Sequence, residues 1–175
     1  MTKPILAFIF LFAFLLRCCQ GANDLTLPPH EFSPTSYYHV FYEFSPPGFI
    51  TIAIQFNKPH QYFGLGLGTG MIGADIWAFQ IINGKLVAND YHGVGFQTPV
   101  LDTASGGKNN LEILGTKVTA TSSFVKFSRA LNTGDKFDKV IKKGKTSFIW
   151  ATKPGSPTLV YHGQPNCGSL TVNLV

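Results

Sequence analysis

The stretch GLGLGTGMIGADIW, residues 64–77, determines how the rest of the chain can fold. It has the features of a strand end, a glycine-rich bend that carries Met71, and a new strand that starts through Asp75. A matching stretch lies near the C-terminus, where IWA at 149–151 is followed by LVYHG at 159–163. A bend with a thioether and a strand end with an imidazole together suggest a two-sided cofactor pocket.

Short alternating segments cover most of the remaining chain. FITIAIQF at 49–56 places its apolar side chains on one face, as a half-buried strand requires. Asn83-Gly84, between two such segments, is a strong hairpin signal. No segment has a helical period of useful length, and Asp135 caps a single helical turn at most. We therefore expect an all-β antiparallel sandwich or barrel. The expected strands are 38–44, 49–56, 62–67, 74–82, 85–92, 111–119, 122–131, 146–152, 158–162 and 169–175, with 93–110 as one long loop that contains at most a short edge strand.

The N-terminus has the features of a cleaved secretory signal. Lys3 precedes an unbroken apolar run at 5–16, which is shorter than the roughly 20 residues that span a bilayer. We expect a signal peptide at 1–21, an extended proline-containing arm at 22–36, and one folded domain at 37–175. An uncleaved membrane anchor is the less favoured alternative. The expected product is secreted and extracellular, with no transmembrane segment after signal cleavage.

The charge of the expected mature chain is mildly positive. Without Lys3 and Arg17, twelve basic residues face nine acidic ones, and the resulting +3 is too small to indicate nucleic-acid binding. The lysines gather in one segment, which is more typical of a solvated turn than of a docking site for an acidic partner. They are Lys136, Lys139, Lys142, Lys143 and Lys145.

Cys167 is the single cysteine of the expected mature chain, because Cys18 and Cys19 belong to the signal. No intramolecular disulfide can then form, so stability has to come from an apolar core, and a chain of about 150 residues can bury one. A packed thiol is the ordinary role of such a residue. The secretory route leaves a disulfide-linked dimer through Cys167 open.

Catalytic and nucleotide-binding patterns do not fit this chain. Residues 68–73 satisfy G-x-G-x-x-G, but that fingerprint binds a pyrophosphate only where a strand leads into a helix, and 74–82 alternates like a strand. Asp135 and Asp138 are spaced for a turn, and the five histidines have no zinc-type spacing. We therefore expect no enzymatic activity and no catalytic residues.

Met71 and His162 remain as candidate cofactor ligands. Spacing alone favours ordinary roles, a core methionine and a hydrogen-bonded histidine at a strand end. Methionine with histidine is nevertheless an axial ligand pair of electron-transfer haem, in which the thioether raises the reduction potential.

Several motifs, taken in order, resemble those of the DOMON family. They are GMIGADIW at 70–77, VKFSR at 125–129, LNTGD at 131–135 with Asp138, FIWA at 148–151 and VYHG at 160–163. Each motif is loose, but their shared order is specific. The resemblance covers roughly residues 37–175.

The resemblance implies an antiparallel immunoglobulin-like β-sandwich that is usually extracellular. Haem-binding members use the methionine of the glycine bend and the histidine of the Y-H segment as axial ligands of b-type haem, which are Met71 and His162 here. Many relatives carry Arg-Gly after this histidine, whereas this chain has Asn166-Cys167-Gly168. The chain therefore lacks the arginine that, in those relatives, is expected to contact a haem propionate.

Two functions follow from the resemblance. The first is a secreted electron-transfer module that binds heme b through Met71 and His162 and exchanges electrons with a separate redox partner. The alternative is a haem-free adhesion or interaction module that binds a carbohydrate or a protein. The intact Met/His pair favours haem, and the absence of a fused redox domain in this sequence favours binding.

Overall fold

The computed structural model describes residues 23–56 and 60–175, so the expected signal peptide lies outside the described residues. Within these ranges the chain forms eleven β-strands and one short 3-10 turn. The elements are β1 (His30–Thr35), β2 (Tyr38–Glu43), β3 (Phe49–Phe56), β4 (His60–Leu67), β5 (Asp75–Ile82), β6 (Lys85–His92), β7 (Val100–Leu101), η1 (Asp102–Ser105), β8 (Glu112–Val118), β9 (Ser123–Ala130), β10 (Gly144–Pro154) and β11 (Cys167–Leu174).

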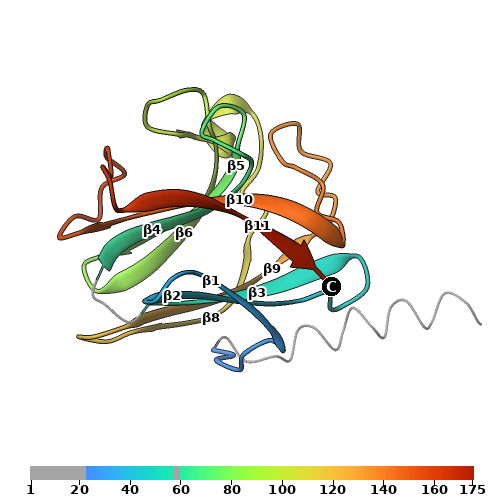
Figure 1. The fold of residues 1–175 in the computed structure, drawn as a ribbon, viewed down its shortest axis with the longest axis horizontal. Helices are drawn as coiled ribbons and strands as arrows, with labels where there is room; N and C mark the ends of the chain where they lie inside the picture. Colours follow the sequence, from blue (N-terminus) through green and yellow to red (C-terminus); the bar gives the residue numbers. More distant parts are fainter. Residues whose placement is uncertain (1–22, 57–59) are drawn as a thin grey trace, which may run out of the picture.

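The strands form two antiparallel sheets that pack face to face (Figure 1). The five-stranded sheet has the order β1-β2-β3-β9-β8, and the six-stranded sheet has the order β11-β10-β4-β5-β6-β7. The expected antiparallel β-sandwich is therefore confirmed. Asn83 and Gly84 both have positive φ, 51° and 75°, as the tight hairpin between β5 and β6 requires.

A chain of aromatic rings joins the two sheets in the core. Phe56 of β3 lies with its ring centroid 3.7 Å from that of Phe63 on β4, and Phe63 lies 5.0 Å from Phe79 on β5. Phe127 of β9 completes the chain at 5.3 Å from Phe79 and 5.5 Å from Trp77. All five side chains are buried, and such rings contribute both buried area and ring–ring attraction.

The N-terminal segment differs from the predicted arm. Residues 30–35 form β1 and pair with β2, so they belong to the sandwich. Upstream of β1, Asp24 accepts a 2.8 Å hydrogen bond from Lys126 on β9, which lowers the pKa of Asp24 to about 2. The Asp24 amide donates to the carbonyl of Leu114 on β8. Prolines in the segment did not prevent pairing, because β1 is an edge strand and needs only one partner.

Two further segments differ from the prediction, one wholly and one in part. Segment 158–162, predicted as a strand, has no strand partner and lies in the long connection between β10 and β11. Segment 93–110 contains the short edge strand β7, as predicted, and the 3-10 turn η1, which was not predicted. Among the described residues, no helix is long and apolar enough to cross a membrane.

Cys167 is the first residue of β11 and is half-buried, opposite Ala151 of β10. We expect Cys167→Ser to change the free energy of unfolding by no more than about 1–2 kcal/mol, because it replaces one small, partly exposed group. Thermal unfolding of both proteins would measure this. A collapse of the melting temperature, or a dimer band that disappears on reduction, would show a larger role for the thiol.

A candidate cofactor site on the six-stranded sheet

The outer face of the six-stranded sheet has small side chains, or none, at its centre. Side chains alternate along each strand, so Leu65 and Trp77 face the core while Gly64, Gly66 and Ala78 face outward. A Cβ atom at Gly66 would lie 3.0 Å from both the Asp75 carbonyl oxygen and the Ile149 side chain. The glycines therefore keep a shallow, apolar surface between β4 and its neighbours.

A small apolar cluster covers this outer face. Its buried members come from β5, the residue before it, and β6: Ala74, Ile76, Ala78 and Tyr91. Met71 packs against the cluster from the glycine bend, and Leu159 packs against it from the β10–β11 connection. The structure therefore brings the two stretches singled out in the sequence to one face of one sheet.

The Met71 bend is held by the neighbouring loop. The Gly73 amide donates to the Gly93 carbonyl and the Gly93 amide donates to the Ala74 carbonyl, both at 2.8 Å. Gly93 leaves no room for a side chain, because a Cβ atom there would collide with the Met71 carbonyl. Gly73 has φ of 64°, which a glycine adopts without strain. The bend is thus a packed element and not a free loop.

Three side chains of the sheet hold the β10–β11 connection over the same face. Gln80 donates to the Pro157 carbonyl at 2.6 Å, Tyr62 donates to the Val160 carbonyl at 3.1 Å, and Lys153 donates to the Tyr161 carbonyl at 2.8 Å. Its carbonyls thus bond to side chains instead of a neighbouring strand. This is the physical reason that 158–162 is not a strand.

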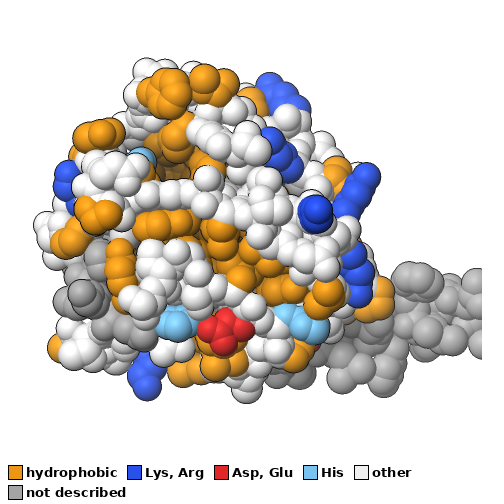
Figure 2. All heavy atoms as spheres, in the orientation of Figure 1, with side chains coloured by type: hydrophobic (Ala, Val, Ile, Leu, Met, Phe, Trp, Pro, Cys, Tyr) orange, Lys and Arg blue, Asp and Glu red, His pale blue; other side chains and the backbone are white. Residues whose placement is uncertain are grey.

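His162 follows directly in this connection. Its carbonyl accepts a 2.9 Å hydrogen bond from Asn166, and its ring is half-buried. Burial lowers the pKa of His162, and the charge of Lys153 lowers it further. A lowered pKa favours the neutral imidazole, which is the form that binds a metal. Figure 2 shows a hollow on one face of the molecule with hydrophobic side chains inside it.

A buried ion-pair cluster lies under the base of the Met71 bend. Arg129 of β9 contacts Asp75 at 2.8 Å and Asp138 at 2.9 Å, and all three side chains are almost fully buried. The Lys139 amide also donates to Asp75, at 2.7 Å. The predicted turn that contains Asp138 is therefore anchored in the core, whereas Asp135 bonds to loop amides, among them that of Phe137.

Asp90 is the fourth ionisable member of the cluster. Carboxylate oxygens of Asp75, Asp90 and Asp138 lie within 4.8 Å of one another, a spacing that could hold a metal ion, and Arg129 supplies a positive charge among them. Burial raises the pKa of Asp90 to about 8, with a further contribution from Asp75. Burial also raises the pKa of Asp75 to about 6, against the opposing effect of Arg129. Asp90 could not be recognised from the sequence, since nothing in its local pattern shows that it faces the core opposite Trp77.

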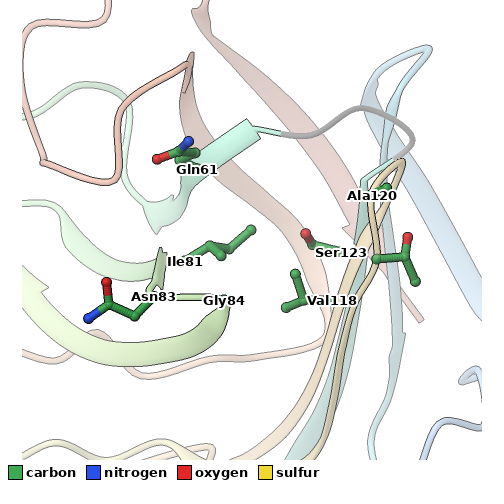
Figure 3. Close-up of a pocket in the computed structure, with 8 residues that line it drawn as sticks. Gln61, Ile81, Asn83, Gly84, Val118, Ala120 and Ser123 are labelled. Carbon is green, nitrogen blue, oxygen red and sulfur yellow. The ribbon is translucent and has the colours of Figure 1, made fainter.

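The opposite end of the sandwich has an open cavity of about 340 Å³ between the β5–β6 hairpin and the β8–β9 turn (Figure 3). Its lining has no charged side chain and no histidine, so it offers little chemistry. The lining residues are Gln61, Ile81, Asn83, Gly84, Val118, Thr119, Ala120 and Ser123.

The model of the DOMON domain family matches residues 34–153. The chain belongs to the DOMON family. Met71 lies inside the matched region, and His162 lies nine residues beyond its end. No curated protein sequence matches this DOMON chain.

Two solved structures share the DOMON fold seen here. The cytochrome b domain of pyranose dehydrogenase from Coprinopsis cinerea superposes with a TM-score of 0.60 at 16% identity, covering 82% of this chain and 80% of that one. The cytochrome domain of cellobiose dehydrogenase from Myriococcum thermophilum gives 0.55 at 11% identity, covering 86% and 90%. At such identities the likeness establishes the fold.

We expect Gly93→Ala to displace the Met71 bend. The added Cβ atom meets backbone that cannot rotate away, so the free energy of unfolding should fall by about 1–3 kcal/mol. Gly70→Ala is the matched control, because nothing lies within 4 Å of its added Cβ atom. It should stay within about 0.5 kcal/mol of the wild type. Chemical denaturation measures both, and equal effects would contradict the docked bend.

We expect the stability of the domain to fall as pH rises from about 4 to about 8. Asp75 and Asp90 hold their protons in the folded state up to about pH 6 and 8, whereas unfolded aspartates release theirs near pH 4. Each group contributes a slope of at most about 1.4 kcal/mol per pH unit. Asp90→Asn should flatten the upper part of the profile, and Glu43→Gln, on the other sheet, should not. A wild-type stability that rises through this range would contradict the assignment.

Proposed function

We propose that this DOMON domain binds b-type haem for electron transfer, with Met71 and His162 as axial ligands. One observation carries the proposal: the Met71 bend and the connection that holds His162 pack over the same apolar, glycine-lined face. Haem supplies a one-electron couple when bound, and the chain supplies the two ligands and the environment.

The residues of this face suit a flat apolar ring. Gly64 and Gly66 carry no side chain, and Ile76 and Ile149 supply apolar surface beside them. A neutral His162 imidazole is a good donor to iron, and the Met71 thioether is a weaker one that favours the reduced state. Met71 and His162 are each half-buried.

We further propose that the domain works outside the cell and has no catalytic role of its own. The segment 1–21 keeps the features of a secretory signal. Cytochrome domains of pyranose and cellobiose dehydrogenases share its fold. Its electrons would then pass to or from a separate redox protein.

The second candidate is a haem-free module that binds a carbohydrate or a protein. Two aromatic side chains favour it, since Phe96 is 92% exposed and Tyr161 is 82% exposed on loops beside the site. Exposed rings of this kind can stack on a sugar or anchor a partner.

We expect the secreted chain, supplied with haem, to show a Soret band and sharp α and β bands on reduction. His162→Ala should lose most of the haem, because imidazole is the stronger donor. Met71→Leu keeps volume and apolarity, so it should retain more haem but have a lower reduction potential. Visible spectroscopy and a redox titration measure these effects.

His30→Ala is the matched control, since it removes a histidine from β1 on the other sheet. It should leave the spectrum unchanged. If the wild-type chain shows no such bands, the electron-transfer proposal fails and the binding module takes its place.

A further inference from the structure

The loops around the proposed site expose a set of large apolar side chains, which we call the apolar rim. Phe96 is 92% exposed, Tyr161 82% and Ile72 69%. Soluble domains rarely gather such side chains in one place unless the surface binds something. Figure 2 shows hydrophobic side chains on the loop tips near the hollow. The members of the rim are Ile72, Val94, Phe96, Val160 and Tyr161.

The members of the apolar rim come together through contacts already described. Ile72 precedes Gly73, which is hydrogen-bonded to Gly93, the residue before Val94. Val160 and Tyr161 follow Leu159, which packs against the same small cluster as Met71. Three loops that are far apart in the sequence therefore border one face of the six-stranded sheet.

A lysine-lined groove adjoins the same bend. It has a volume of about 460 Å³, and Gly68 and Thr69 of the bend form one of its walls. Four lysines line it and no acidic residue does, so the charged side chains of its lining are all positive. We call Lys139, Lys142, Lys143 and Lys145 the lysine border.

The segment that carries the lysine border is fixed to the core. The Lys139 amide bonds to buried Asp75, and Ile141 is 3% exposed with its amide bonded to the Leu131 carbonyl. The Lys143 ammonium lies 5.2 Å from the centre of the Phe44 ring. The anchoring fixes the backbone from which these lysines extend. Lysines held in this way suit a docking surface for an acidic partner, which the sequence pattern left as the less favoured alternative.

We propose that the apolar rim and the lysine border together dock an acidic redox protein whose contact surface has an apolar centre bordered by carboxylates. This inference rests on the proposed function, because it places the partner beside the Met71 bend. Specific interfaces combine an apolar centre with a polar margin, and complementary charges there speed and orient the encounter. The lysines on one side only would fix the orientation of the partner.

Other occupants fit this surface less well. A second copy of the chain would have to bring its own lysines to the same contact, where like charges repel. A bilayer would gain little from a groove whose lysines lie on one side of the apolar rim only. A protein with a protruding apolar patch fills such a surface.

The first experiment needs no haem. The probe is a fluorescein-labelled synthetic peptide with a Phe-Leu-Phe centre and four glutamates on each side, and fluorescence anisotropy with the full secreted chain gives Kd. We expect binding that weakens with salt. Lys142→Glu with Lys143→Glu should raise Kd by about tenfold, and Phe96→Ala by about fivefold.

The matched control reverses two lysines at the far end of the sandwich. Lys85→Glu with Lys117→Glu should change Kd by less than about twofold, because both positions lie away from the bend. A version of the peptide with lysine in place of glutamate should not bind. Circular dichroism confirms that each variant is folded.

The second experiment reports electron exchange in the haem-loaded chain. Stopped-flow oxidation of the reduced protein by ferricyanide, a trianion, should slow severalfold in the Lys142→Glu, Lys143→Glu variant. Oxidation by tris(phenanthroline)cobalt(III), a trication, should become faster. The control pair should alter neither rate appreciably.

Some results would overturn the proposal. One is a peptide Kd that does not change when Lys142 and Lys143 are replaced. Another is equal binding of the lysine peptide. A third is sedimentation of the chain with phosphatidylserine vesicles that Phe96→Ala abolishes, which would assign the surface to a membrane. Peptide binding that follows the expected pattern in a chain that takes up no haem would support an acidic partner protein while refuting the electron-transfer role.

Discussion

The buried pairing of Arg129 with Asp75 and Asp138 is the interaction on which the functional end of the molecule depends. It joins β9 to the start of β5 and to the segment that follows β9. Removing one partner of such a pair leaves an uncompensated buried charge and typically costs about 3–5 kcal/mol. Asp75 follows the Met71 bend directly, and its carboxylate also holds the Lys139 amide. The candidate ligand and the lysine border are thus positioned by one cluster.

Stability and the proposed function use opposite faces of the six-stranded sheet. The inner face carries Trp77 and the phenylalanine rings that meet the other sheet. The outer face carries Gly64, Gly66 and Ala78, small residues beside which Ile76 and Ile149 pack closely. The proposed site thus uses the outer face, whereas the aromatic core that joins the sheets lies on the inner face. Loops anchored on that face then determine what reaches it.

The strands could be predicted wherever alternation was local. Nearly every segment with period-two apolar spacing formed a strand, because one face of each such strand has to be buried against the other sheet. In the exceptions, contacts with residues distant in the sequence outweighed the local pattern. Segment 158–162 looks like a strand but is held by Tyr62, Gln80 and Lys153. Residues 30–35 look like an arm but find a free strand edge at β2.

Local sequence patterns sufficed to predict the sandwich class, the hairpin at Asn83-Gly84, and the Met71 and His162 stretches as candidates. Those features follow from local periodicity, from glycine conformations and from motifs in order. The folded chain alone reveals that both stretches lie on one outer face, and that Asp90 and Asp138 join the Arg129 cluster. It also showed that the lysine segment is anchored to Asp75. Such pairings join residues tens of positions apart, and whether a carboxylate faces water or the core depends on which strand lies opposite it.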